Sequence, residues 1–200
     1  MRHSKHCLLA GLVCAAVSCA LPAQADNWIN QSFDDGWWRA EFQAAGGAYS
    51  GETSRGGDYY VAASIEYEWP VFARCTLGLR FYPLFLFHEE EDEDYGAGTI
   101  YGGAFGIAGR MYRNPEERRG WFAEAGVALL LHSDKFEGNG GNLNFLNEIG
   151  VGYKWRNDWH LSVKWEHISN GGTSRPNSGV NTFALAVGKS FRLGRKPDAL

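Results

Sequence analysis

Apolar and polar residues alternate with a period of two along most of the chain after Gly36. This period is typical of β-strands, because successive side chains of a strand point to opposite faces. Eight alternating segments follow one another, separated by turn residues, and no helical periodicity lies between them. They begin near Trp38, Tyr59, Thr76, Thr99, Trp121, Leu143, Trp159 and Asn181. The pattern predicts an all-β, eight-stranded antiparallel sheet that closes on itself.

Each predicted strand has an apolar, aromatic face and an opposite face that carries charge. The charged positions are Arg39, Glu66, Glu68, Arg80, Glu124, Glu148, Lys154, Lys164 and Glu166. A soluble barrel would turn its apolar faces inward and its charges outward. Long and short connections alternate here and aromatic residues cluster at strand ends, which favours an outer-membrane barrel with lipid on the apolar side. We therefore predict an eight-stranded transmembrane β-barrel over residues 26–200, filled by its own side chains and not a general diffusion pore.

One predicted strand contains a proline. The segment Thr76 to Phe87 would place Leu77, Leu79, Phe81, Pro83, Phe85 and Phe87 on one face, opposite Arg80 and Tyr82. Proline has no N–H to donate to a neighbouring strand, so we expect a bulge or a strand end at Pro83.

Composition narrows the class of protein. The 200 residues carry a net charge of -4, which gives no basis for nucleic-acid binding. The mean hydropathy of -0.33 resembles that of a soluble protein. In a membrane barrel, however, the polar inner faces cancel the lipid-facing ones, so this average does not argue against a membrane.

The N-terminus has the features of a secretory signal. Arg2 and Lys5 precede an apolar run from Cys7 to Leu21, and Ala23-Gln24-Ala25 offers small residues for cleavage before Asp26. An N-terminal anchor, or lipidation at Cys19, fits less well, because no longer apolar segment follows and a bulky aliphatic residue is missing at Ala16. Cleavage at residue 25 would leave Cys75 as the one cysteine, without a disulfide partner.

We predict no cofactor and no metal. The run from Glu89 to Asp94 is expected to be a solvated loop, since dense like charges repel. A divalent-cation site is the alternative, but it lacks spaced oxygens and a glycine turn. His88, His132 and His160 lie on separate segments without the paired spacing of metal ligands.

Candidate chemistry lies at the end of the segment Trp159 to Ser169. Its apolar face ends in His167 and Ser169, whereas Glu166 and Ile168 belong to the opposite face. Short turns are expected on the periplasmic side, and the longer loop from Asn170 to Val180 on the outer side. The two side chains would then face the lipopolysaccharide leaflet of a Gram-negative bacterium. Residues two apart on a strand have Cα atoms about 6.6 to 6.8 Å apart, close enough for a histidine to activate a serine.

The motif around these residues is specific. His167-Ile-Ser169-Asn170, followed by Pro176-Asn177-x-Gly179, resembles the signature of the lipid A 3-O-deacylase (PagL-like) family. The resemblance implies an outer-membrane barrel that hydrolyses the ester of the acyl chain at position 3 of lipid A. It also implies that His167 is the base and Ser169 the nucleophile. The third family residue is a glutamate, and Asn181 stands at that position; an asparagine can orient the imidazole but cannot stabilise imidazolium by charge.

Further roles around this pair are hypotheses. Backbone N–H groups from Asn170 to Gly172, Gly171 among them, or the side chains of Asn170 and Asn177, are candidate oxyanion donors. Asn147, a polar residue on the lipid side of the neighbouring strand, is expected either to border the site or to reflect an error in the assigned register. The expected partners are lipopolysaccharide, the outer membrane and the barrel-assembly machinery, and a homodimer is left open.

Two other interpretations remain. The chain could be a catalytically silent outer-membrane barrel with a structural or lipopolysaccharide-binding role, or a soluble periplasmic binder.

The sequence also continues from Arg192 to Leu200 instead of ending on an aromatic residue such as Phe191.

Overall fold

The structure is a computed structural model, and it describes residues 33–48, 56–91 and 97–193. Several sequence predictions fall outside the described residues. These are the signal segment 1–25 with its three cysteines, most of the loop 50–57, part of the acidic run 89–94, and the tail after residue 193.

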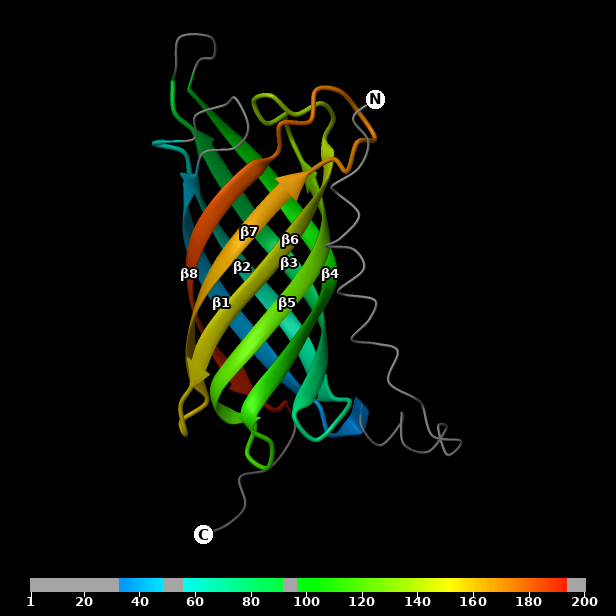
Figure 1. Ribbon diagram of the computed structural model, residues 1–200, viewed down its shortest axis with the longest axis vertical. Coiled ribbons are helices and arrows are strands. Elements are labelled where there is room, and N and C mark those ends of the chain that lie inside the picture. Colours follow the sequence, from blue (N-terminus) through cyan, green and yellow to red (C-terminus); the bar gives the residue numbers. More distant parts are fainter. Residues whose placement is uncertain (1–32, 49–55, 92–96, 194–200) are drawn as a thin grey trace, which may run out of the picture. The chain divides into compact units, whose positions relative to one another are not determined.

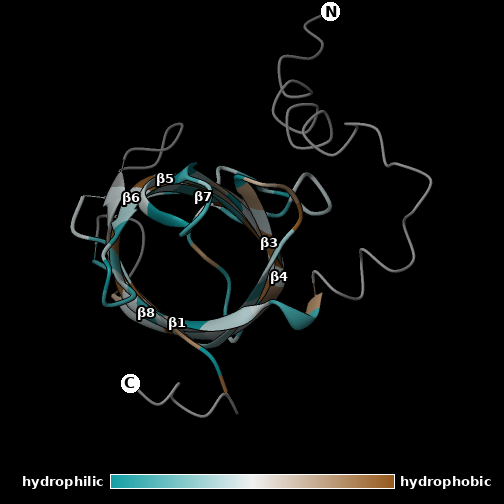
Figure 2. Cartoon of the chain, turned by 90° about the horizontal axis from the view of Figure 1, so that it is seen from below, coloured by the Kyte–Doolittle hydropathy of each residue, from teal (hydrophilic) through white to brown (hydrophobic). Residues whose placement is uncertain are grey.

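The described chain forms a closed antiparallel barrel, as Figures 1 and 2 show. Each strand pairs with the next in sequence, and the first pairs with the last. The strands are β1 (Trp37–Ala48), β2 (Tyr59–Pro70), β3 (Cys75–Glu89), β4 (Gly98–Asn114), β5 (Arg119–His132), β6 (Leu143–Lys154), β7 (Trp159–Ser169) and β8 (Val180–Phe191). The predicted fold class is therefore confirmed.

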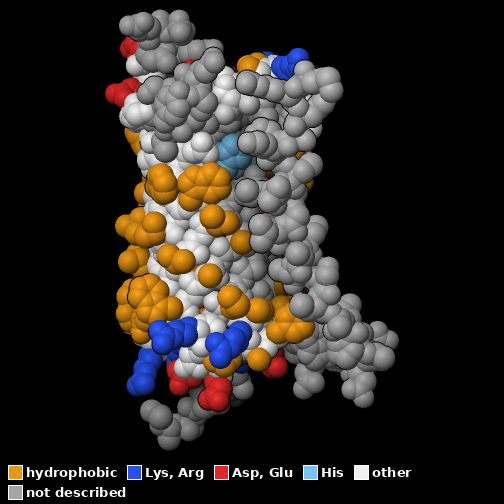
Figure 3. Space-filling view, viewed as in Figure 1, with side chains coloured by type: hydrophobic (Ala, Val, Ile, Leu, Met, Phe, Trp, Pro, Cys, Tyr) orange, Lys and Arg blue, Asp and Glu red, His pale blue; other side chains and the backbone are white. Residues whose placement is uncertain are grey.

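The outer wall of the barrel is apolar. Large hydrophobic side chains are exposed along every strand, among them Phe42, Ile65, Leu79, Phe105, Leu129, Ile149, Val163 and Leu185. In Figure 3 they cover the side wall, whereas lysine, arginine and acidic side chains lie at its upper and lower ends. Within the described part of the chain, no helix is long and apolar enough to cross a bilayer. Apolar residues outside and charges inside are the distribution of a barrel surrounded by lipid.

The proline of β3 lies at a bulge, as predicted. The pairing of β3 with β4 shifts between Tyr82 and Phe85. The bulge also reverses the alternation, because one extra residue exchanges the two faces of a strand. The prediction that Phe85 and Phe87 share the outer face with Leu79 was therefore wrong, and both rings are fully buried inside the barrel.

The lumen near the short turns is filled by a network of ion pairs. Arg80 Nε lies 2.5 Å from Glu66 Oε2, and Arg80 also contacts Glu148. Arg110 contacts the same Glu66, and its Nη2 lies 3.1 Å from Glu124 Oε2. Buried charges are tolerated when each has a close partner of opposite sign. The predicted interior network is thus confirmed, and its side chains fill the barrel at this level.

Towards the long loops the lumen becomes apolar. Its buried cluster includes Tyr60, Phe85, Phe87, Leu130, Phe136, Leu146, Ile168 and Val180. Phe87 and Phe136 meet with ring centroids 5.0 Å apart. Because Phe136 belongs to the loop after β5, that loop folds inward over the cluster. The loop after β5 consequently rests on a packed apolar cluster, which also includes Ile168 near the end of β7.

Candidate functional site

His167 and Ser169 lie on the outer face of β7, at the end of the strand just before the loop. Both side chains are half-buried, whereas the intervening Ile168 and the preceding Glu166 are fully buried in the lumen. This is the sidedness that the alternation predicts. A potential nucleophile and a potential base therefore stand at the lipid-facing wall near the rim with the long loops.

His167 is the centre of a polar row that crosses three strands. Its cross-strand partners are Asn147 on β6 and Asn181 on β8. The Nδ1 atom of His167 lies 2.8 Å from Asn181 Oδ1. Because an amide oxygen can only accept, Nδ1 carries the hydrogen and Nε2 remains the basic nitrogen. Asn147 Nδ2 donates to the backbone oxygen of His167 at 3.4 Å, so Asn147 borders the site and the assigned register was correct.

An apolar row lies directly beside the polar one. Ile149, Trp165 and Phe183 are cross-strand partners one step closer to the middle of the wall. The Trp165 ring is stacked near the His167 ring, with centroids 6.1 Å apart and planes inclined by 13°. The imidazole thus stands at a boundary between polar groups and a lipid-like surface.

Ser169 occupies the next position on the same face as His167. In the described structure, the Ser169 hydroxyl and the His167 imidazole are not hydrogen-bonded to each other. Side chains two apart on a strand can meet through rotamer changes, and nucleophile–base contacts are often looser before substrate binds. The cross-strand partner of Ser169 is Phe145, which places an aromatic ring beside the hydroxyl.

Gly179 allows the chain entering β8 to pass close to the imidazole. Its φ of 73° lies in the left-handed region, where side chains are disfavoured. A Cβ atom at this position would lie 2.8 Å from Cε1 of His167. The glycine of the motif therefore has a physical reason, because any side chain there would displace the ring.

Asn170 is turned into the loop and away from the outer face. It is fully buried, and its Oδ1 accepts from the backbone N–H of Gly172 at 2.8 Å. Its own backbone N–H donates to Asn177 Oδ1 at 3.1 Å. These groups are engaged within the loop, which leaves the exposed Gly171 N–H and the Asn177 amide nitrogen as the oxyanion candidates with free donors among the described residues.

No described carboxylate hydrogen-bonds to His167. Glu166 accepts from Tyr60 and, at 3.0 Å, from Thr182 inside the barrel. Glu148 accepts from Arg80 and, at 3.1 Å, from Tyr82. Both acids therefore belong to the lumen, as the alternation predicts, and among the described side chains the hydrogen-bond partner of Nδ1 is Asn181.

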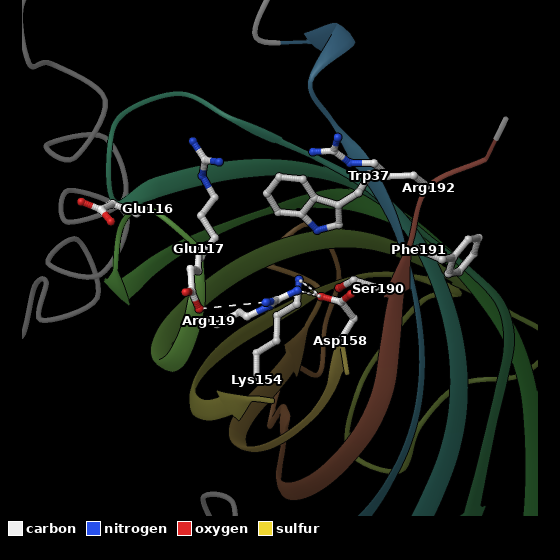
Figure 4. Close-up of a pocket in the computed structure, with 10 residues that line it drawn as sticks. Trp37, Glu116, Glu117, Arg119, Lys154, Asp158, Ser190, Phe191 and Arg192 are labelled. Atoms are coloured by element: carbon white, nitrogen blue, oxygen red, sulfur yellow. Dashed lines mark ion pairs between the residues drawn. The ribbon is translucent and has the colours of Figure 1, made fainter. Parts of the chain in front are cut away.

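The opposite end of the barrel holds a cavity of about 560 Å³, drawn in Figure 4. Arg119 and Lys154 share the carboxylate of Asp158 there, at 3.5 and 3.6 Å, beneath the ring of Trp37. Its lining residues include Ser190 but no histidine that could act as a base for a serine. Within the described ranges, no three histidine, cysteine or acidic side chains are grouped to hold a metal ion.

Sequence reasoning missed the residues behind Asn170. His132, Asn139 and Asn144 are buried next to the loop that follows Ser169. The concentration of asparagine and glycine from residue 138 to residue 144 was the one available signal, because such residues favour hydrogen-bonded turns.

Comparisons with known proteins identify the family and the fold of this chain. A family model described as Lipid A 3-O-deacylase (PagL) matches residues 35–190. The lipid A deacylase PagL of Pseudomonas aeruginosa is 36% identical over 67 residues, which cover 32% of this chain and 39% of that protein. The match thus spans about two fifths of that relative. The crystal structure of the outer membrane enzyme PagL superposes with a TM-score of 0.57 at 22% identity, covering 74% of this chain and 98% of that one.

Proposed function

The chain belongs to the lipid A 3-O-deacylase (PagL) family, and we propose that it is an outer-membrane esterase that removes the 3-O-linked acyl chain of lipid A. The substrate is lipopolysaccharide in the outer leaflet. The observation that carries the proposal is the placement of Ser169, His167 and Asn181 together on the lipid-facing wall, with His167 held through Nδ1.

The reaction is an acyl transfer to Ser169 followed by hydrolysis. His167 Nε2 takes the proton of the Ser169 hydroxyl as the oxygen attacks the ester carbonyl. The imidazolium then returns this proton to the leaving sugar oxygen, which departs as a hydroxyl. Water, activated by the same Nε2, hydrolyses the acyl-enzyme and releases the 3-hydroxy fatty acid.

Asn181 orients the base without adding charge. Its Oδ1 fixes the Nδ1–H tautomer, which leaves Nε2 as the basic nitrogen that can accept the serine proton. An amide cannot stabilise the imidazolium as strongly as a carboxylate, so the rate should lie below that of a site with glutamate at this position. The exposed Gly171 N–H and the Asn177 amide are the proposed donors to the oxyanion.

The same proposal covers processing and partners. Residues 1–25 would be removed as a signal peptide, and the barrel-assembly machinery would insert residues 26–200 into the outer membrane. A homodimer would form through the apolar outer wall. It is not required for the reaction as proposed, because Ser169, His167 and Asn181 come from one chain.

The direct test is mass spectrometry of lipid A after incubation of purified lipopolysaccharide with the refolded protein in detergent micelles. We expect the wild type to remove one 3-hydroxyacyl group and Ser169→Ala to remove none. Ser162→Ala is the matched control, because Ser162 lies on the same strand but faces the lumen. Equal release by wild type and Ser169→Ala would reject the proposal.

A catalytically silent, lipopolysaccharide-binding barrel is the second candidate, and the missing charge at Asn181 is the observation that favours it. It predicts that the wild type binds lipopolysaccharide in a pull-down but leaves the lipid A mass unchanged. The same experiment therefore separates the two functions.

A further inference from the structure

A chain of buried side chains leads from the rim of β5 to the residue that follows Ser169. Asn170 Nδ2 donates to Asn139 Oδ1 at 2.7 Å, and Asn139 Nδ2 donates to Asn144 Oδ1 at 3.0 Å. Asn144 Nδ2 then lies 2.5 Å from His132 Nε2. The four side chains are each at most 7% exposed, so water does not offer alternative partners.

The direction of these hydrogen bonds is fixed at the Asn170 end. The Asn170 Oδ1 atom faces the backbone N–H of Gly172, which can only donate. On its other side, Nδ2 faces the backbone oxygens of Gly140 and Pro176, at 2.9 and 3.1 Å, which can only accept. The Asn170 amide therefore has one allowed orientation.

That orientation propagates to the imidazole. Since Asn170 donates to Asn139, Asn139 must donate to Asn144, and Asn144 must donate to His132 Nε2. His132 Nδ1 lies 2.5 Å from the backbone oxygen of Asp134, so Nδ1 carries the hydrogen and Nε2 is the acceptor. The contacts of Asn170 and those of His132 therefore require the same direction for this series of hydrogen bonds. The series ends at the lone pair of His132 Nε2, which accepts the hydrogen from Asn144.

This series of hydrogen-bonded side chains joins two outer loops. Residues 133–142 follow β5, and residues 170–179 follow β7. Gly140 N donates to Pro176 O at 2.7 Å, Ser178 N donates to Gly138 O at 2.8 Å, and Asn139 and Asn177 form an isolated β-bridge. Asn170 lies at the centre of this contact, and Asn177 accepts from its backbone N–H.

We propose that His132, Asn144 and Asn139 are positioning residues of the candidate site, which act through Asn170 to hold the backbone after Ser169. They fix where Gly171 and Asn177 lie relative to the Ser169 hydroxyl. The inference rests on the proposed function, because it assigns these groups to the same ester hydrolysis. None of the three reaches the outer face or touches the substrate.

A matched pair of variants at residue 132 isolates the acceptor. His132→Gln places a carbonyl oxygen near the Nε2 position and can receive the Asn144 hydrogen. His132→Asn is one methylene shorter, so its amide can reach only the Nδ1 side. Both variants are uncharged amides, and Lys135→Ala, at an exposed position of the same loop, is the control for a change in the loop itself.

The rate measurement should separate positioning from binding. We expect kcat for fatty-acid release to fall about tenfold or more in His132→Asn, because small displacements of reacting groups are costly, with KM unchanged. His132→Gln should stay within about threefold of the wild type. An unaltered kcat in His132→Asn, equal losses in both variants, or a change confined to KM would overturn the proposal.

Amide hydrogen exchange gives an independent readout. Exchange of residues 170–179 should quicken in His132→Asn but not in His132→Gln or Lys135→Ala, while the strands stay protected in all four proteins. Equal exchange in the loop would contradict the coupling. Should the wild type release no fatty acid, the deacylase proposal fails by itself, and the exchange comparison still decides whether His132 controls the loop.

Discussion

The two faces of β7 differ in the polar side chains that they carry and in the partners of these side chains. On the inner face, Lys164 Nζ lies 2.5 Å from Glu41 Oε1 and 3.5 Å from Glu148 Oε2, so charge is met by opposite charge. On the outer face, His167 contacts the neutral Asn181. On β7, formal charge is confined to the lumen-facing side chains, and the polar row on the outer face is made of amides, an imidazole and a hydroxyl. A lipid boundary makes unpartnered charge expensive, so the neutral row suits its location.

This separation means that stability and chemistry can be altered independently. Side chains of the lumen hold the barrel together, and those of the outer row contact the proposed substrate. Adjacent residues such as Glu166 and His167 can therefore have unrelated roles.

The largest effect on stability is expected in the lumen. The guanidinium of Arg110 lies within 3.4 Å of carboxylate oxygens of Glu66, Glu68 and Glu124. Arg110→Leu removes this shared partner from all three. Removal of one member of a buried ion network typically costs about 3–5 kcal/mol. Urea unfolding in micelles should show this loss, while the folded fraction keeps its rate of fatty-acid release. A loss of rate without a loss of stability would contradict the division.

A change at Asn181 should act on the chemistry alone. Asn181→Leu removes the acceptor of the His167 Nδ1 hydrogen, and kcat should fall by about tenfold to a hundredfold. Asn181→Glu should instead raise kcat if charge is what the site lacks. Initial rates with purified lipopolysaccharide measure both variants. No response to either would show that Asn181 does not orient the base.

A smaller effect is expected at the apolar row. Trp165→Leu removes the ring that stacks on His167, a contact of the kind worth about 0.5–1.5 kcal/mol. We expect a rise of a few fold in KM and a smaller fall in kcat. Val163→Leu, one step further from the imidazole on the same face, is the control, and equal effects of the two substitutions would argue against a specific contact.

The smallest effect is expected at the end with the short turns. Glu117 and Arg119 lie 4.0 Å apart with half-exposed or exposed side chains. Such pairs contribute less than about 1 kcal/mol, so Glu117→Gln should leave both the unfolding midpoint and the rate near wild-type values. A clear loss of activity would show that this end takes part in function.

The sequence predicts the barrel well, because each strand has one charged and one apolar face. The alternation of residue types therefore shows which side chains face the lumen and which face outward. Phe85 and Phe87 show the limit of this reasoning. A bulge at Pro83 moves the period by one residue, and the sequence indicated the bulge but not its consequence for the rings that follow.

The site was predicted in part. His167, Ser169 and Asn181 could be placed on one face by counting along strands. The direction of the Asn170 side chain could not, because its partner Asn139 is 31 residues away in another loop. Contacts between loops depend on how both loops fold over the lumen, and local periodicity carries no information about that.

The most direct test of the central claim is covalent labelling with a lipid-like fluorophosphonate, followed by peptide mass spectrometry. We expect one adduct, on Ser169, that forms in the wild type and in Ser162→Ala. The variant His167→Ala, which retains Ser169, should be labelled at least about a hundredfold more slowly, because the base is missing. Equally fast labelling of Ser169 with and without His167, or no adduct on Ser169 in the wild type, would contradict the claim that these two outward-facing side chains act together.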